Sequence, residues 1–166
     1  MRKSVKTLRL GIDAVLVLAC LILVVPNILH SCPFLIGASD SYIVLGRSME
    51  PALRLGDLAF IIRVEPSDVK VGDVVAVKTD SVVYMHRVVE KRVADEGVLF
   101  KLKGDANEDL DPGYVKASDI MGKVCFSIPT GYFYTPYGYI LTVATPLMLL
   151  ATNQAIKIYK FYSRGK

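Results

Sequence analysis

The sequence predicts a mostly β protein, in which a small antiparallel β-domain is flanked by N- and C-terminal transmembrane helices. Two observations lead to this fold class. An apolar run lies near each end of the chain, and each run is bordered by basic residues. Between them, short Val- and Ile-rich runs alternate with turn residues. The mean hydropathy of +0.41 agrees with a protein that contacts a membrane.

Charged residues are unevenly distributed along the chain. The 166 residues include 20 Lys and Arg and 16 Asp and Glu, for a formal net charge of +4. Without the eight basic residues at the two ends, the remainder is mildly acidic and has no contiguous basic stripe. We therefore exclude nucleic acid as a partner. The eight are Arg2, Lys3, Lys6, Arg9, Lys157, Lys160, Arg164 and Lys166.

The first apolar run, residues 10–29, predicts a transmembrane helix preceded by a cytoplasmic basic N-terminus, residues 1–9. Asp13 lies near its start and Pro26 near its end. A cleaved signal peptide is the alternative, because residues 29–32 are faintly similar to a secretory or lipoprotein cleavage site. The length of the run and the bulky His30 argue against cleavage. Both interpretations put the chain beyond residue 30 outside the cytosol.

The second apolar run, residues 137–155, is diluted by Thr, Asn, Gln and Pro, and tyrosines precede it. It predicts a second transmembrane or interfacial helix at 136–156, followed by a cytoplasmic basic tail at 157–166. Two spans would return both basic ends to one side of the membrane. The alternative is a single anchor with a surface-bound tail.

The segment 30–135 predicts an extracytoplasmic β-domain. Turn residues such as Gly56-Asp57 and Gly72-Asp73 separate its Val- and Ile-rich runs. We expect a closed or partly closed antiparallel sheet. In the run at 82–90, period-two alternation puts Tyr84 and His86 on one face and Met85 on the other, and both faces are apolar enough to be covered. The predicted strands are 58–64, 74–78, 82–90, 98–103 and 120–127.

The three cysteines do not form a recognisable framework. Cys20 lies inside the first apolar run, and the sequence leaves open whether Cys32 and Cys125 form a disulfide. The chain contains no CxxC motif and no His/Cys ligand spacing, so we predict no metal site and no cofactor.

His86 is the one base in the predicted domain that is suited to neutral pH, because the other histidine, His30, belongs to the membrane exit. Ser48 lies in a short loop between Gly46 and Pro51, which can present a hydroxyl group. Taken singly, His86 is more often a core-edge histidine and Ser48 more often a turn serine than a catalytic residue. A nucleophilic serine needs a base and a third group that orients the base.

An acidic segment after the strand at 98–103 offers that third group. Asp105 and Asp111 are the leading candidates, and Asp109 remains open. The alternation of Asp105, Asn107, Asp109 and Asp111 also suggests a calcium loop. Against calcium, Lys116 occupies the twelfth position, where an EF-hand carries Glu.

A series of short motifs resembles the successive boxes of signal peptidase I. His86 precedes Arg87 where bacterial members carry lysine, so the resemblance is to the archaeal and endoplasmic-reticulum branch, which implies a Ser-His-Asp mechanism. The match covers about residues 44–124. The motifs are Ser48-Met49-Glu50-Pro51, Leu55-Gly56-Asp57-Leu58, Gly72-Asp73-Val74-Val75, His86-Arg87-Val88, Lys103-Gly104-Asp105 and Gly122-Lys123-Val124.

The resemblance implies a role for each matched residue. It makes Ser48 the nucleophile, His86 the general base, Asp111 the carboxylate that orients the base, and Asp105 a second important acid. The family usually shows Ser-Gly before its nucleophile, whereas Gly46-Arg47 stand there in this chain. A hydroxyl two residues upstream therefore cannot bind the oxyanion, which leaves the Ser48 N–H and a second, unidentified donor.

The implied function is a membrane-bound serine endopeptidase that removes signal peptides from secretory preproteins after small residues. Its partners would be preproteins, membrane lipid, and the translocation machinery or accessory subunits. It would lie in the cell membrane or endoplasmic reticulum membrane as a multi-pass protein, with the catalytic domain on the extracytoplasmic or lumenal face. The alternatives are a noncatalytic binding or assembly subunit, and a processing peptidase dedicated to a few envelope proteins.

Overall fold

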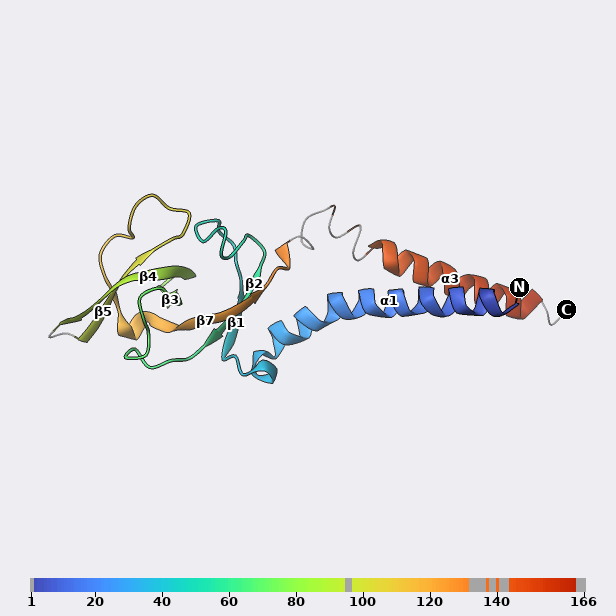
Figure 1. The fold of residues 1–166 in the computed structure, drawn as a ribbon, viewed down its shortest axis with the longest axis horizontal. Helices are drawn as coiled ribbons and strands as arrows, with labels where there is room; N and C mark the ends of the chain where they lie inside the picture. Colours follow the sequence, from blue (N-terminus) through green and yellow to red (C-terminus); the bar gives the residue numbers. More distant parts are fainter. Residues whose placement is uncertain (1, 95–96, 132–136, 138–139, 141–143, 164–166) are drawn as a thin grey trace. The chain divides into compact units, whose positions relative to one another are not determined.

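The computed structural model describes residues 2–94, 97–131, 137, 140 and 144–163. The chain divides into two compact units. One comprises residues 1–27 and 132–166, and the other comprises residues 28–131. Figure 1 shows the helices and strands of the two units.

The predicted helix at 10–29 lies within a longer helix, α1, which spans Arg2–Ser31. Pro26 does not interrupt it, and the side chain of Asn27 donates a hydrogen bond to the Leu23 carbonyl at 2.8 Å. The segment Asp13–Ser31 of α1 is long and apolar enough to cross a membrane. Among the described helices, it is the one that meets this test.

The C-terminal helix, α3, spans Thr145–Ser163 and is therefore displaced toward the C-terminus from the predicted 136–156. Pro146 suits the first turn of a helix, and the Lys residues of the predicted tail are good helix formers, so the helix continues through Lys157 and Lys160. Most of the predicted segment before residue 145 lies outside the described residues.

Residues 28–131 form one antiparallel sheet of seven strands, in the order β1-β2-β7-β3-β4-β5-β6. In the part of the chain that the structure describes, no pairing joins β1 to β6, so of the two predicted alternatives, a closed and a partly closed sheet, the fully closed one is not formed. The strands are β1 Asp40–Ile43, β2 Leu58–Ile62, β3 Val74–Lys78, β4 Val83–Ala94, β5 Gly97–Lys103, β6 Val115–Lys116 and β7 Ile120–Ile128, with 3-10 helices η1 at Pro33–Ile36 and η2 at Ala117–Asp119.

All five predicted strands are present, and β4 continues beyond its expected end at Glu90 to Ala94. Sequence analysis missed β1 and β6. β1 is a four-residue strand that begins Asp40-Ser41, and β6 contains only two residues, so neither contains a Val- or Ile-rich run.

The core consists of clusters that cover both faces of the central strands. Tyr84 packs against a cluster on one face, and Met85 packs against a cluster on the other. This confirms that both faces of the strand carrying His86 are covered. The first cluster contains Val69, Val75, Val77, Val88, Phe100 and Leu102, and the second contains Val44, Met49, Leu53 and Ala59.

The three cysteines are free thiols in this structure, so Cys32 and Cys125 do not form a disulfide. Cys125 donates to the Phe60 carbonyl with a sulfur–oxygen distance of 3.3 Å. Cys32 directly follows α1, whereas Cys125 lies on β7, and the two sulfur atoms are not bonded.

Candidate active site

Ser48 lies in the loop that joins β1 to β2. Its neighbour Met49 is only 2% exposed and packs with Val44, Leu53 and Ala59 in a core cluster. The buried methionine anchors the loop to the sheet, while Ser48 remains half-buried at its surface. The Ser-Met pair therefore combines an anchor with an accessible hydroxyl.

His86 lies on β4, directly opposite Val75 of β3. Its Nε2 atom is 3.0 Å from the Ser48 Oγ atom. The Tyr84 ring, two residues earlier on the same face, meets the imidazole edge to face at a centroid distance of 5.2 Å. This contact restricts rotation of the imidazole and agrees with the alternation expected from the sequence.

Asp111 reaches the other side of the imidazole. Its backbone N–H donates to the Leu102 carbonyl at 3.0 Å, and Leu102 pairs with Val88, two residues from His86. The Asp111 Oδ2 atom lies 2.5 Å from His86 Nδ1. The two side chains are 14% and 13% exposed, so water has little access to this contact.

These contacts define the imidazole tautomer. A carboxylate can only accept a hydrogen bond, so Nδ1 carries the proton that points toward Asp111. Nε2 then has a free lone pair that can accept the hydroxyl proton of Ser48. The three side chains are thus arranged as a nucleophile, a base and a group that orients the base.

Asp105 does not contact His86 in the described structure and instead forms a bidentate pair with Arg87. Arg87 Nε donates to Asp105 Oδ1 at 2.8 Å, and Nη2 donates to Oδ2 at 2.6 Å. Arg87 Nη1 also donates to the Gly72 carbonyl at 2.7 Å. The hydrogen bonds to Asp105 raise the pKa of Arg87 above its ordinary value, although burial opposes them. This pair joins β4 to the acidic turn beside Ser48.

The acidic turn also contacts the serine loop directly. The backbone N–H of Ala106 donates to the Ser48 carbonyl at 2.8 Å. A Cβ atom added to Gly104 would lie only 2.7 Å from that same carbonyl oxygen. Position 104 therefore accepts only glycine without displacing the backbone of Ser48.

Asp109 is exposed and has no hydrogen bond or ion pair with any residue that the structure describes. Of the three candidate acids, only Asp111 lies within hydrogen-bond distance of His86. The calcium interpretation is also unsupported, because Asp105 and Asp111 face Arg87 and His86. No group of three potential metal ligands occurs among the described residues.

The backbone N–H of Ser48 donates to none of the described residues and is available for an oxyanion. A Cβ atom at Gly46 would lie 4.0 Å from Ser48 Oγ, so the missing side chain at this position would face the hydroxyl. The contacts of the described residues do not identify a second donor.

A cavity of about 390 Å³ adjoins Ser48 and is lined mainly by apolar side chains. Tyr84 lines this cavity, and its ring also contacts the His86 imidazole. Burial, and secondarily the charges of Asp111 and Asp119, raise the pKa of Tyr84 above its ordinary value. The cavity lining includes Tyr42, Val44, Leu45, Met49, Leu53 and Met85.

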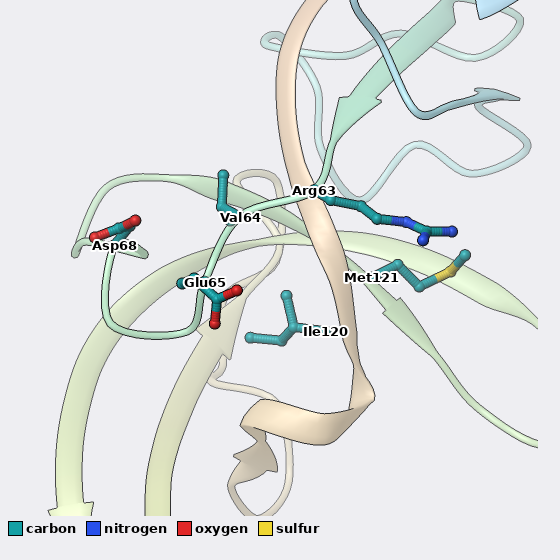
Figure 2. Close-up of a pocket in the computed structure, with 6 residues that line it drawn as sticks. All are labelled: Arg63, Val64, Glu65, Asp68, Ile120 and Met121. Atoms are coloured by element: carbon teal, nitrogen blue, oxygen red, sulfur yellow. The ribbon is translucent and has the colours of Figure 1, made fainter. Parts of the chain in front are cut away.

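A second, larger cavity of about 660 Å³ contains none of the predicted site residues. It lies between the segment after β2 and the beginning of β7 (Figure 2). Arg63, Glu65 and Asp68 give it a mixed charge and are exposed. His30 is also separate from Ser48, because its Nδ1 atom lies 2.7 Å from Ser41 Oγ at the start of β1.

Comparisons with known proteins agree with this geometry. Residues 38–125 match the family model described as peptidase S24-like. The signal peptidase complex catalytic subunit SEC11C of Canis lupus familiaris is 31% identical over 101 residues, which cover 55% of this chain and 53% of the relative. The corresponding SEC11 of Clavispora lusitaniae is 32% identical over 115 residues, covering 66% and 68%.

A third relative, sec11 of Sclerotinia sclerotiorum, is 37% identical over 110 residues, covering 57% of this chain and 64% of the relative. The chain thus spans about half the length of the first relatives it matches. These similarities confirm the resemblance to the endoplasmic-reticulum branch of signal peptidase I that the sequence motifs indicate.

Proposed function

Because this chain belongs to the peptidase S24-like family, we propose that it is a membrane-bound serine endopeptidase that removes signal peptides from secretory preproteins. The main observation behind the proposal is the pair of contacts made by His86. Its Nε2 atom is 3.0 Å from Ser48 Oγ, and its Nδ1 atom is 2.5 Å from Asp111 Oδ2. Its relatives are named as catalytic subunits of the signal peptidase complex.

In the proposed reaction, His86 Nε2 accepts the Ser48 proton as Oγ attacks the carbonyl carbon of the scissile bond. The Ser48 N–H donates to the resulting oxyanion, and Asp111 stabilises the imidazolium ion. His86 then gives its proton to the departing amine, which leaves an acyl-enzyme. Water, deprotonated by His86, attacks the ester and restores Ser48.

The apolar lining of the cavity beside Ser48 supports a preference for apolar residues before the cut. The small size of these residues is what the resemblance to signal peptidase I implies. We propose cleavage after a small residue, with another small residue two positions earlier.

Contacts between α1 and α3 support a second membrane span. By length and apolar composition, only α1 among the described helices qualifies as a span. Asn153 Nδ2 donates to Asp13 Oδ1 at 3.3 Å, and Lys157 Nζ lies 3.8 Å from Asp13 Oδ2. Ionisable residues in membrane helices are normally paired inside a helix bundle. We therefore propose that α3 lies in the bilayer against α1, with residues 1–9 and the basic end of the chain in the cytoplasm.

This topology places the proposed catalytic domain, residues 30–135, on the extracytoplasmic face of the cell membrane or the lumenal face of the endoplasmic reticulum membrane. Preproteins held in the same bilayer would meet the enzyme in two dimensions. Accessory subunits are further proposed partners, because the relatives are named as parts of a complex.

The direct experiment measures cleavage of a preprotein by the purified chain in detergent. We expect Ser48→Ala to abolish cleavage and to retain the circular dichroism spectrum, because it removes only the attacking oxygen. Ser81→Ala, at an exposed turn, is the matched control and should cleave normally. Undiminished cleavage by Ser48→Ala would reject the nucleophile, and an inactive parent protein would favour a noncatalytic binding subunit.

A further inference from the structure

Two polar side chains of the described structure are almost completely buried, and both lie at the base of the loop that carries Ser48. Asp57 is 6% exposed and Thr130 is 3% exposed. Neither contacts Ser48, His86 or Asp111. Buried polar groups are expensive unless they are hydrogen-bonded, so the partners of these two residues indicate what they stabilise.

Asp57 belongs to the neck of the loop, which we define as Val44, Gly56 and Asp57. The Val44 N–H donates to the Asp57 carbonyl at 2.8 Å, and the Gly56 N–H donates to the Val44 carbonyl at 2.7 Å. The Asp57 carboxylate accepts the Arg54 N–H at 2.9 Å. These bonds close residues 44–57 into a loop whose two ends lie side by side.

Thr130 holds the neck from outside the loop. Its Oγ1 atom donates to the Gly56 carbonyl at 2.8 Å, and its N–H donates to the Ile128 carbonyl at the end of β7 at 2.8 Å. Thr130 thus connects the neck to β7 at a position 74 residues further along the chain.

The backbones at this contact are too close to allow other residues. A Cβ atom on Gly56 would lie 2.6 Å from the Gly131 Cα atom, and a Cβ atom on Gly131 would lie 2.2 Å from the Leu55 carbonyl oxygen. Gly56 also has a φ of +85°, which favours glycine. Thr130-Gly131 therefore lies directly against the neck, and among the described residues the Thr130 hydroxyl is the one side-chain group that bridges them.

From these contacts we infer that Thr130 is a positioning residue for the Ser48 nucleophile. The inference rests on the proposed function, because it assigns the residue a part in the same reaction. Ser48 is carried by the loop, whereas His86 is carried by β4, so the position of the neck is one of the contacts, with buried Met49 and the Ala106 N–H, that set the distance between them. Loss of the hydroxyl leaves the half-buried Gly56 carbonyl without this donor and frees the neck to move.

The experiment compares Thr130→Val, which preserves the side-chain volume but removes the donor, with Thr130→Ser, which retains a hydroxyl. Ser39→Ala is the matched control, because the Ser39 hydroxyl also donates to a backbone carbonyl, that of Ile61, but away from the neck. Preprotein cleavage is measured as kcat and KM at a temperature where every variant is folded, and amide hydrogen exchange is measured in parallel.

For Thr130→Val we expect a loss of kcat of about 10- to 100-fold with KM nearly unchanged, since small displacements of reacting atoms have effects of this size. The Val44 and Gly56 amides should exchange faster, while amides of β4 and β5 stay protected. Thr130→Ser should recover kcat and protection, and Ser39→Ala should resemble the parent. Should Thr130→Val fail to fold, Thr130→Ala carries the same expectations.

Wild-type kcat in Thr130→Val, or faster exchange spread equally over β4 and β5, would overturn the inference. Failure of Thr130→Ser to recover either property would also do so. Failure of the proposed function has a different signature. The parent protein would then not cleave, while the exchange of the Val44 and Gly56 amides would still report whether Thr130 holds the neck.

Discussion

Asp109 and Asp111 are two residues apart in an acidic segment, yet only Asp111 contacts His86. The difference comes from the backbone bond between the Asp111 N–H and the Leu102 carbonyl, which aligns Asp111 with β5. The resemblance to a family favoured Asp111, but the residues by themselves left Asp109 open, because both have the same chemistry and nearly the same position.

Substitution of these two acids tests the geometry at the residue scale. Asp111→Asn should lower kcat by about 10³- to 10⁴-fold, because an amide that presents its N–H favours the wrong imidazole tautomer. Asp109→Asn replaces the same carboxylate by the same amide two residues away and should leave kcat within about twofold of the parent. Equal losses in the two variants, measured by preprotein cleavage, would contradict the assignment.

Gly104 offers a second test at this scale. Gly104→Ala should lower kcat by roughly 100-fold, because its Cβ atom would displace the Ser48 carbonyl. Gly46→Ala is the control, since its Cβ atom would make an ordinary contact at 4.0 Å with Ser48 Oγ. The measurements are kcat and the thermal unfolding midpoint of each variant, which separate a loss of activity from a loss of stability. If Gly104→Ala were fully active, the close contact would have no bearing on the nucleophile.

Ser48 and His86 were predictable as a pair because histidine is scarce and because the motifs resemble an enzyme family. The pairing of Arg87 with Asp105 was missed, although both residues lie in those motifs. No sequence signal identified Thr130, because its contact is with a backbone carbonyl that is 74 residues away.

At the scale of elements, η1 exposes three consecutive apolar side chains. Phe34, Leu35 and Ile36 are 70%, 59% and 39% exposed. The candidate span of α1 ends at Ser31, only two residues before η1 begins. With the proposed membrane span, chain continuity would keep η1 near the membrane surface, where exposed apolar side chains gain by entering the lipid interface.

Tryptophan fluorescence tests this placement, because the chain contains no Trp. We expect Phe34→Trp in lipid vesicles to emit at short wavelength and to be quenched by brominated lipid. Val93→Trp is the control, since Val93 is 80% exposed near the end of β4 and should emit as in water. Equal quenching at both positions, or none at position 34, would argue against an interfacial η1.

The strands show which elements a sequence can predict. β3 was predicted with its observed bounds, because its run of Val and Ala is buried between turn residues. β1 was not, since it is held in the sheet by its pairing with β2 and not by its own composition.

At the scale of the whole molecule, α1 and α3, the two helices of the unit that comprises residues 1–27 and 132–166, run antiparallel. Asp13 contacts Asn153 and Lys157, while Leu150 shares an apolar cavity of about 240 Å³ with Cys20. Contacts nearer the start of α1 thus involve residues nearer the end of α3. The sequence suggested a second span from its charge pattern, but it did not indicate which residues face α1.

Disulfide formation tests this helix pair. In a background without Cys32 and Cys125, Leu150→Cys should form a disulfide with Cys20 on mild oxidation in membranes, because both positions line one cavity. Met148→Cys, at a position 74% exposed, should not. Non-reducing electrophoresis after proteolysis between the helices shows the product. Cross-linking at position 148 alone would require a different packing of α3.

By itself, the sequence determined the β-rich domain and the apolar N-terminal helix, because hydrophobic periodicity and turn residues are local properties of the chain. The Ser48–His86 pair came from the resemblance of the motifs to a peptidase family. The tertiary structure alone decided the open strand order, the pairing of Arg87 with Asp105 and the neck of the serine loop. Each of these depends on contacts between segments far apart in sequence, and neither periodicity nor composition contains the register that brings such segments together.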